Sequence, residues 1–253
     1  MTKVNEGKTI MKLTFLGTGA ADWNGPDARG EYRRFTSTLL DGALLIDVTR
    51  TVLDEIPDPA AVTDVFFTHS HRDHFDIEAL RALAPCRVFA HESWADTISG
   101  AGLTVMPLTV GRPVETTGFT VTPMPSNHST ERPQETTLHY LFEKDGKHLL
   151  YATDGAWLRN EEHRIIGQTP LDGIVFDATI GDGFDGDWRI FEHNSIDMIR
   201  LMLRTLLKTG RLRDGAPVFL THLARTLHAP HPQLERQTEP PFVVCFDGME
   251  RVI

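Results

Sequence analysis

The sequence predicts an α+β fold in which two β-sheets pack against each other and helices cover their outer faces. Short apolar runs bounded by turn residues occur throughout the chain, which is typical of strands. Asp41-Gly42 and Asp145-Gly146 each separate two such runs, and residues of this type tolerate the positive φ angles that close a β-hairpin. Segments with helical spacing lie between the runs. Hairpins imply antiparallel pairing, so the pattern favours a sheet-on-sheet core over a purely parallel, doubly wound sheet.

The expected elements follow in chain order. Strands are expected at 13–16, 38–40, 43–46, 65–67, 87–90, 119–121, 138–142, 149–152, 174–176 and 218–220, because each is a short apolar run between turn residues. The clearest helix is expected at 195–210, where Ile196, Ile199, Leu203 and Leu206 repeat at helical spacing and Gly210 supplies a stop. Less regular patterns predict further helices at 77–84 and 156–166.

Composition indicates one ordered domain. With 253 residues, 40% hydrophobic and 24% charged, we expect a single domain over residues 11–253 after a flexible extension of residues 1–10. The 35 acidic residues exceed the 25 basic ones, which disfavours an extended nucleic acid as partner. The polar start lacks the apolar stretch of a secretory signal, and no run approaches membrane-spanning length. The expected setting is cytoplasmic, without a membrane, and a homodimer is left open.

A dense group of metal-type side chains follows the apolar run at 65–67. Three histidines and an aspartate, His69, His71, Asp73 and His74, lie within six positions. Imidazole and carboxylate are common ligands of divalent metals. In an extended segment His69 and His71 project to the same side, whereas Asp73 and His74 lie further along the loop and can serve a second ion. This run predicts a metal site at the end of a buried strand.

The same arrangement recurs later in the chain. His128 follows the strand expected near 119–124, Asp154 follows the strand at 149–152, and His222 follows the strand at 218–220. Four apolar strands therefore end in residues suited to a metal. The two cysteines, Cys86 and Cys245, lie far apart, so neither a disulfide framework nor a cysteine-rich zinc site is indicated.

The run from His69 to His74 resembles the HxHxDH motif of the metallo-β-lactamase superfamily, and His128, Asp154 and His222 fall where that superfamily's remaining ligands fall. The resemblance covers nearly the whole chain and implies a four-layer αββα sandwich. It also implies two divalent ions, zinc or manganese or iron. The ligand sets implied are His69, His71 and His128 for one ion and Asp73, His74 and His222 for the other, with Asp154 bridging.

Further segments resemble the phosphoribosyl cyclic phosphodiesterase (PhnP-like) branch. They are Leu13 to Gly19, Arg33 to Ser37 and Phe246 to Glu250. Glu192-His193-Asn194-Ser195 is similar to the place where that branch carries a histidine proposed as general acid, so the resemblance implies catalytic roles for His193 and Asp73. Some members carry a cysteine-rich structural zinc site in the stretch that corresponds to residues 20–31. No cysteine occurs there in this chain, and we expect a different pocket wall without structural zinc.

Several other residues are candidates for substrate contacts. Arg34, Asp177 and His228 are the ones we select, and their neighbours Arg33, Asp182, Asp185 and His231 could join them. Gly17-Thr18-Gly19 lacks the third glycine and the acidic residue of a dinucleotide loop, so it predicts a tight turn.

The expected function is hydrolysis of a small, cyclic or linear, phosphodiester. In this interpretation a hydroxide that bridges two metals attacks phosphorus, and His193 protonates the leaving alkoxide. Three alternatives stay open: a metal-dependent acyl hydrolase such as a lactonase or thioesterase, a tRNA 3′-processing nuclease, and a non-catalytic metal-binding or sensor protein on the same fold.

Overall fold

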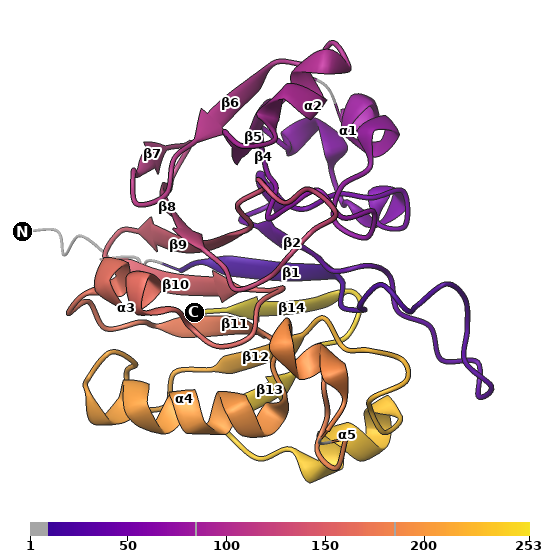
Figure 1. The fold of residues 1–253 in the computed structure, drawn as a ribbon, viewed down its shortest axis with the longest axis vertical. Coiled ribbons are helices and arrows are strands. Elements are labelled where there is room, and N and C mark those ends of the chain that lie inside the picture. The colour runs from indigo at the N-terminus through magenta and orange to yellow at the C-terminus, as the bar shows by residue number, and fades with distance from the viewer. Residues whose placement is uncertain (1–9, 84, 185) are drawn as a thin grey trace, which may run out of the picture.

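The computed structural model describes residues 10–83, 85–184 and 186–253, so nearly all of the expected N-terminal extension lies outside the described residues. Two seven-stranded sheets face each other, and helices lie outside them (Figure 1). In spatial order the first sheet contains β14 (Met249–Val252), β1 (Lys12–Gly17), β2 (Ser37–Leu40), β3 (Leu44–Ile46), β4 (Asp64–Phe66), β5 (Arg87–His91) and β6 (Val105–Leu108). The second contains β13 (Phe242–Val244), β12 (Val218–Thr221), β11 (Gly173–Asp177), β10 (Lys147–Ala152), β9 (Leu138–Lys144), β8 (Thr120–Pro125) and β7 (Val114–Glu115).

The α-helices are short apart from one. They are α1 (Ile77–Leu83), α2 (Ala95–Gly100), α3 (Asn160–Ile166), α4 (Ile196–Lys208) and α5 (His231–Gln237). Three 3₁₀ turns, η1 (Leu53–Glu55), η2 (Pro59–Ala61) and η3 (Trp188–Phe191), lie in the connections. Within the described part of the chain, no helix is long and apolar enough to cross a membrane.

Three apolar layers hold the sheets and helices together. Between the sheets, Phe66 stacks on Phe89 at a centroid distance of 4.3 Å and meets Tyr140 edge-on. Below the second sheet, Ile199 of α4 packs into a cluster with strand residues of that sheet. Above the first sheet, Leu80 of α1 takes part in a third cluster. The fold is therefore an αββα sandwich, which confirms the predicted architecture.

Both predicted hairpins are present. Asp41 and Gly42 have φ of 49° and 74° between β2 and β3, and Asp145 and Gly146 have φ of 47° and 77° between β9 and β10. Positive φ at both central residues matches the right-handed twist of the strands that such a turn joins. Each sheet also contains a parallel run, β3 to β6 and β10 to β13, so the sheets are mixed.

The helix predicted at 156–166 is too long at its start. It begins at Asn160, because Ala156 and Trp157 form hydrogen bonds outside the helix, to Asn127 O and Asn194 Oδ1. The predicted helix at 77–84 is present as α1 up to Leu83, and residue 84 lies outside the described residues. The predicted helix at 195–210 is α4, which Ser195 caps through its side chain.

The strand order places several strand ends together. β8 and β10 are both antiparallel to β9 and therefore parallel to each other, and β11 and β12 run parallel to β10. Consequently the carboxyl ends of β8, β10, β11 and β12 meet at one edge of the second sheet. The residues that follow these strands converge there with the loop after β4.

Candidate metal centre and active site

One group of possible ligands combines the loop after β4 with the ends of β8 and β10. His69, His71, His128 and Asp154 each offer a ligand atom, and these atoms all lie within 4.8 Å of one another. His69 Nε2 lies 2.9 Å from His71 Nδ1, and His128 Nε2 lies 3.2 Å from the same atom. Asp154 Oδ2 completes the group at 3.2 Å from His69 Nε2.

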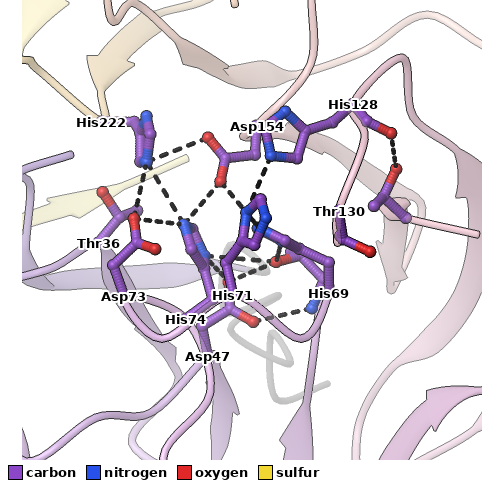
Figure 2. Close-up of polar contacts among 12 residues, drawn as sticks. Thr36, Asp47, His69, His71, Asp73, His74, His128, Thr130, Asp154 and His222 are labelled. Atoms are coloured by element: carbon purple, nitrogen blue, oxygen red, sulfur yellow. Dashed lines mark hydrogen bonds and ion pairs between the residues drawn. The ribbon is translucent and has the colours of Figure 1, made fainter. Parts of the chain in front are cut away.

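A second group shares Asp154 with the first. It consists of Asp73, His74, Asp154 and His222. His74 Nε2 lies 2.7 Å from Asp154 Oδ2, and His222 Nε2 lies 3.0 Å from Asp154 Oδ1. Asp73 Oδ2 is 3.5 Å from His74 Nε2 and 3.6 Å from His222 Nε2. Figure 2 shows Asp154 between the two groups of histidines. The structure thus brings together all seven residues predicted as metal ligands.

The spacing of these atoms fits two adjacent divalent ions. With zinc–nitrogen bonds of about 2.0 to 2.1 Å, two ligands of a tetrahedral ion lie about 3.3 Å apart. Neighbouring ligand atoms in both groups lie close to that separation, and Asp154 Oδ1 is buried with no hydrogen-bond partner among the described residues. A buried carboxylate oxygen left in this way is costly unless a cation binds it. The residues therefore fit a dinuclear site with Asp154 between the ions.

Asp47 fixes the orientation of His74. It follows β3, and its Oδ2 accepts a hydrogen bond from His74 Nδ1 at 2.7 Å. The proton therefore sits on Nδ1, and Nε2 is left to bind a metal. Asp47 also accepts bonds from Thr68 N at 2.8 Å and Thr68 Oγ1 at 2.7 Å, and the same Oγ1 accepts from His69 Nδ1 at 2.9 Å. One buried carboxylate thus orients ligands of both groups.

Asp47 was not among the site residues predicted from the sequence. Its signal has the same form as that of the predicted ligands, a metal-type residue directly after an apolar run at 43–46. A single aspartate after a strand is also typical of a turn, so this signal is weak until the strands are placed in space.

His222 is oriented by a second buried carboxylate. Its Nδ1 donates to Thr179 Oγ1 at 2.8 Å, and that hydroxyl donates to Asp177 Oδ1 at 2.7 Å. Asp177 Oδ2 accepts from His193 Nδ1 at 2.7 Å. Asp177, which is fully buried at the end of β11, therefore connects a possible metal ligand to the predicted general acid.

The pKa values of the possible ligands are shifted by burial and by neighbouring side chains. Burial lowers the pKa of His69 well below its ordinary value and lowers the pKa of His128 to about 4. Both imidazoles are therefore neutral near pH 7, which is the form that binds metals. Burial alone would raise the pKa of Asp154, but interactions with the neighbouring imidazoles of His222 and His74 outweigh burial and lower it well below the usual range.

The pKa of His193 is raised, in contrast to the pKa values of His69 and His128. Burial alone would lower its pKa, but the negative charge of Asp177, the hydrogen bond to Asp177 and the nearby negative charge of Asp154 outweigh burial and raise the pKa well above the ordinary value. The side chain lines a cavity of about 200 Å³ that is also lined by His71, Asp73 and His128. A protonated imidazole thus faces the same space as the possible metal ligands.

Three of the residues that build the site have a strained backbone. Asp47, Asp154 and His222 have φ of 56°, 55° and 56°, in the left-handed region that non-glycine residues seldom adopt. Such conformations persist where surrounding contacts hold them, and they are frequent at functional sites. Here all three closely follow a buried strand, and the turn of the chain directs each side chain toward the cluster.

The residues predicted to contact substrate do not line the cavity beside the possible metal ligands. Among the described residues that line the cavity, Arg34, Asp177 and His228 do not occur. Arg34 pairs with Glu55 and Asp247, and His228 Nε2 donates to Ala178 O at 2.6 Å. Their neighbours also lie away from it: Arg33 and His231 bond each other at 3.0 Å, Asp182 pairs with Arg200, and Asp185 lies outside the described residues. The tight turn predicted at Gly17-Thr18-Gly19 is wrong: Gly17 ends β1 and Gly19 forms a bridge with Phe35, and both glycines allow the backbone of residues 34–35 to approach closely.

Comparisons with known proteins identify the superfamily domain and the fold. A family model described as a beta-lactamase superfamily domain matches residues 45–223. A diphosphatase from the PhnP family has a similar structure, with a TM-score of 0.72, 19% identity and coverage of 97% of this chain and 98% of the other. The metallo-beta-lactamase fold protein YhfI from Bacillus subtilis has a TM-score of 0.73 and 17% identity, with coverage of 97% of this chain and 100% of the other. The short form of human tRNase Z has a TM-score of 0.67 and 17% identity, with coverage of 95% of this chain and 98% of the other. A search of curated protein sequences finds no match.

Proposed function

The chain belongs to the metallo-β-lactamase superfamily, and from its metal-dependent hydrolase fold we propose a more specific activity: hydrolysis of a small phosphodiester at a dinuclear metal centre. The observation that carries the proposal is the Asp177–His193 pair, whose imidazole faces the same cavity as the two ligand groups joined by Asp154. A similar structure named as a diphosphatase is consistent with chemistry at phosphorus.

The residues that would hold the ions are the seven of the two groups described above. When bound there, two divalent ions lower the pKa of water and neutralise the negative charge of a phosphoryl group. Zinc, manganese and iron all suit a set of five imidazoles and two carboxylates. Asp47 and Thr179 keep the ligand histidines in the required tautomer through the hydrogen bonds given above.

His193 supplies the proton that a departing alkoxide needs. Its Nδ1 is held by Asp177, so the opposite nitrogen, Nε2, is the one that donates. The raised pKa keeps the imidazole protonated at pH 7. Asp177 is not among the described residues that line the cavity, and it acts by positioning His193 and maintaining its charge.

A substrate panel tests the proposal. Protein purified without chelator is analysed for metal and assayed on a cyclic phosphodiester, on bis(p-nitrophenyl) phosphate and on a lactone. We expect about two metal ions per chain and cleavage of at least one diester. Cleavage of the lactone alone would replace the proposal with an acyl hydrolase, and retardation of tRNA in a gel would favour a processing nuclease.

A variant tests the role of His193 separately. His193→Ala is expected to lower kcat on a diester by roughly 100-fold or more while the metal content is retained, because general acid catalysis contributes about 10² to 10⁴. His148→Ala, at a partly buried histidine in β10, is the matched control. Unchanged turnover of His193→Ala would remove the acid role. Cytoplasmic location and a homodimer stay predictions from the sequence.

A further inference from the structure

One wall of the cavity carries charged side chains that are not among the seven possible ligands. Asp22, Arg189 and Glu192 line the cavity together with those ligands. They come from the loop after β1 and from the segment of η3 that precedes His193. Arg189 is the cation among them, and it lines the same cavity as the possible ligands.

Contacts with Asp187 and Thr226 hold the Arg189 guanidinium in place. Nε donates to Asp187 Oδ1 at 2.8 Å, and Nη2 donates to Asp187 Oδ2 at 2.9 Å. Nη1 donates to Thr226 Oγ1 at 3.3 Å. A guanidinium has five N–H donors, so these three contacts leave two. Among contacts to described residues, one donor on Nη1 and one on Nη2 are therefore available, and a guanidinium can bind two oxygens of an oxyanion through donors on these two nitrogens.

Arg189 is also fixed relative to the predicted general acid. The backbone N–H of His193 donates to Arg189 O at 2.8 Å, and the N–H of Glu192 donates to the same oxygen at 2.9 Å. One tight turn thus fixes the backbone positions of Arg189 and His193 relative to each other. A substrate that contacts both residues would be oriented without rearrangement of the backbone.

The nearby carboxylates are engaged elsewhere. Asp22 accepts hydrogen bonds from Arg225 N at 2.8 Å, Thr226 N at 3.1 Å and Thr226 Oγ1 at 2.9 Å, and its Oδ2 is 4.0 Å from Arg189 Nη1. Glu192 accepts from Ser129 Oγ. The negative charges of Asp22 and Glu192 offset the positive charge of Arg189 at long range. An anion therefore has to be attracted by direct hydrogen bonds from the free N–H donors of the guanidinium.

We propose that Arg189 is a specificity-determining residue whose free Nη1 and Nη2 donors bind two anionic oxygens of the substrate, so that the cavity selects anionic esters over neutral ones. The inference rests on the proposed hydrolysis of a phosphodiester. It adds a basis for choosing phosphoryl over acyl substrates that the metal ligands do not provide, because the same ligands suit both reactions.

The test uses metal-loaded protein and three variants. Arg189→Gln removes the charge, Arg189→Lys keeps it without the two guanidinium donors, and Arg200→Gln removes a guanidinium that pairs with Asp182 and Asp197 outside the cavity. Binding of inorganic phosphate is measured by calorimetry. KM and kcat are measured on bis(p-nitrophenyl) phosphate and on neutral p-nitrophenyl acetate, and melting curves confirm folding.

Arg189→Gln is expected to weaken phosphate binding and raise KM for the diester by roughly 10- to 100-fold, since charge-assisted hydrogen bonds of this kind contribute about that much. Arg189→Lys should lie between wild type and Arg189→Gln, and hydrolysis of the neutral ester should not change. Phosphate affinity and diester KM within about twofold of wild type in Arg189→Gln, with Arg200→Gln the same, would overturn the proposal. An equal rise of KM on both substrates would also overturn it.

The two proposals fail in distinguishable ways. If wild type cleaves no diester, the proposed function fails, and phosphate binding still reports on Arg189. If wild type cleaves the diester and Arg189→Gln retains its phosphate affinity, the hydrolase proposal stands and the role of Arg189 is removed. Should Arg189→Gln unfold, Arg189→Lys decides the question, because it retains the positive charge beside Asp187.

Discussion

Replacement of Asp47 by Asn is expected to weaken metal binding by the group that contains His74. The carboxylate accepts from His74 Nδ1 at 2.7 Å and from Thr68 at two positions. An Asn side chain has one acceptor oxygen, so it cannot accept all three bonds. If its amide faces His74, the imidazole must accept at Nδ1 and carry its proton on Nε2. That nitrogen is then unable to bind a metal.

The size of the effect depends on how many ligands Asp47 orients. Hydrogen-bond partners of metal ligands contribute about 10- to 100-fold to metal affinity, or about 1.4 to 2.8 kcal/mol. Asp47 is fully buried and also acts on His69 through Thr68, so we expect the upper part of that range. Zinc and manganese titrations of chelated protein by calorimetry, with a competing chelator, measure the affinity of each site.

Asp172→Asn is the matched control for this variant. Asp172 is also buried and also accepts several bonds, from Lys147 Nζ and His148 N, but it precedes β11 at the opposite edge of the sheet. Its replacement should leave metal affinity unchanged. If Asp47→Asn binds both ions as wild type does, the proposed orientation of His74 by Asp47 is wrong.

Three further outcomes are expected. Gly17→Ala should destabilise the fold by about 3 kcal/mol or more in urea unfolding, because its Cβ would lie 1.9 Å from Phe35 O, whereas Gly25→Ala, with no atom within 4 Å, should have little effect. Burial lowers the pKa of His228 to about 4, so His228 stays neutral in the folded state while the unfolded chain takes up a proton as pH falls below about 6.5. Stability should therefore decrease between pH 6.5 and 4 by up to about 3 kcal/mol, and His228→Gln should flatten this decrease relative to His163→Gln; parallel pH profiles would contradict it. Removal of metal should lower Tm by roughly 10 °C, since ligand at 1,000 times Kd contributes about 4 kcal/mol, and an unchanged Tm after dialysis against chelator would argue against a bound metal in the native state.

The sequence predicted the elements that have strong local signals. The hairpin at Asp41 and Gly42 and the helix capped by Ser195 depend on turn chemistry, capping and periodicity, all of which act over a few residues. Strands β6, β7, β13 and β14 were not predicted, because their local signals are weak. β6 contains Pro107, which is unusual inside a strand, and β7 has two residues, so each is stabilised by its neighbour in the sheet rather than by its own pattern.

The site shows a similar division. The clustering of the seven possible ligands was predictable because each follows an apolar strand, and the αββα arrangement brings the strand ends together. Asp177 was predicted to contact substrate, but its place at the end of a fully buried strand directs it to His193 and Thr179 instead. Whether a buried carboxylate such as Asp177 contacts substrate or neighbouring side chains depends on strand order, and strand order is a property of the whole fold.

The residues around Arg189 extend beyond the part of the chain that the family model matches. The match extends over residues 45–223, which includes all seven possible ligands and Arg189. Asp22 and Thr226, which hold or adjoin the Arg189 guanidinium, lie before and after it. The buried sheets fix the ligand geometry, whereas the cavity wall consists of surface loops that can vary without disturbing the core. We therefore expect changes at Asp22, Arg189 or Thr226 to alter which ester is cleaved, and changes at the ligands to abolish cleavage of every ester.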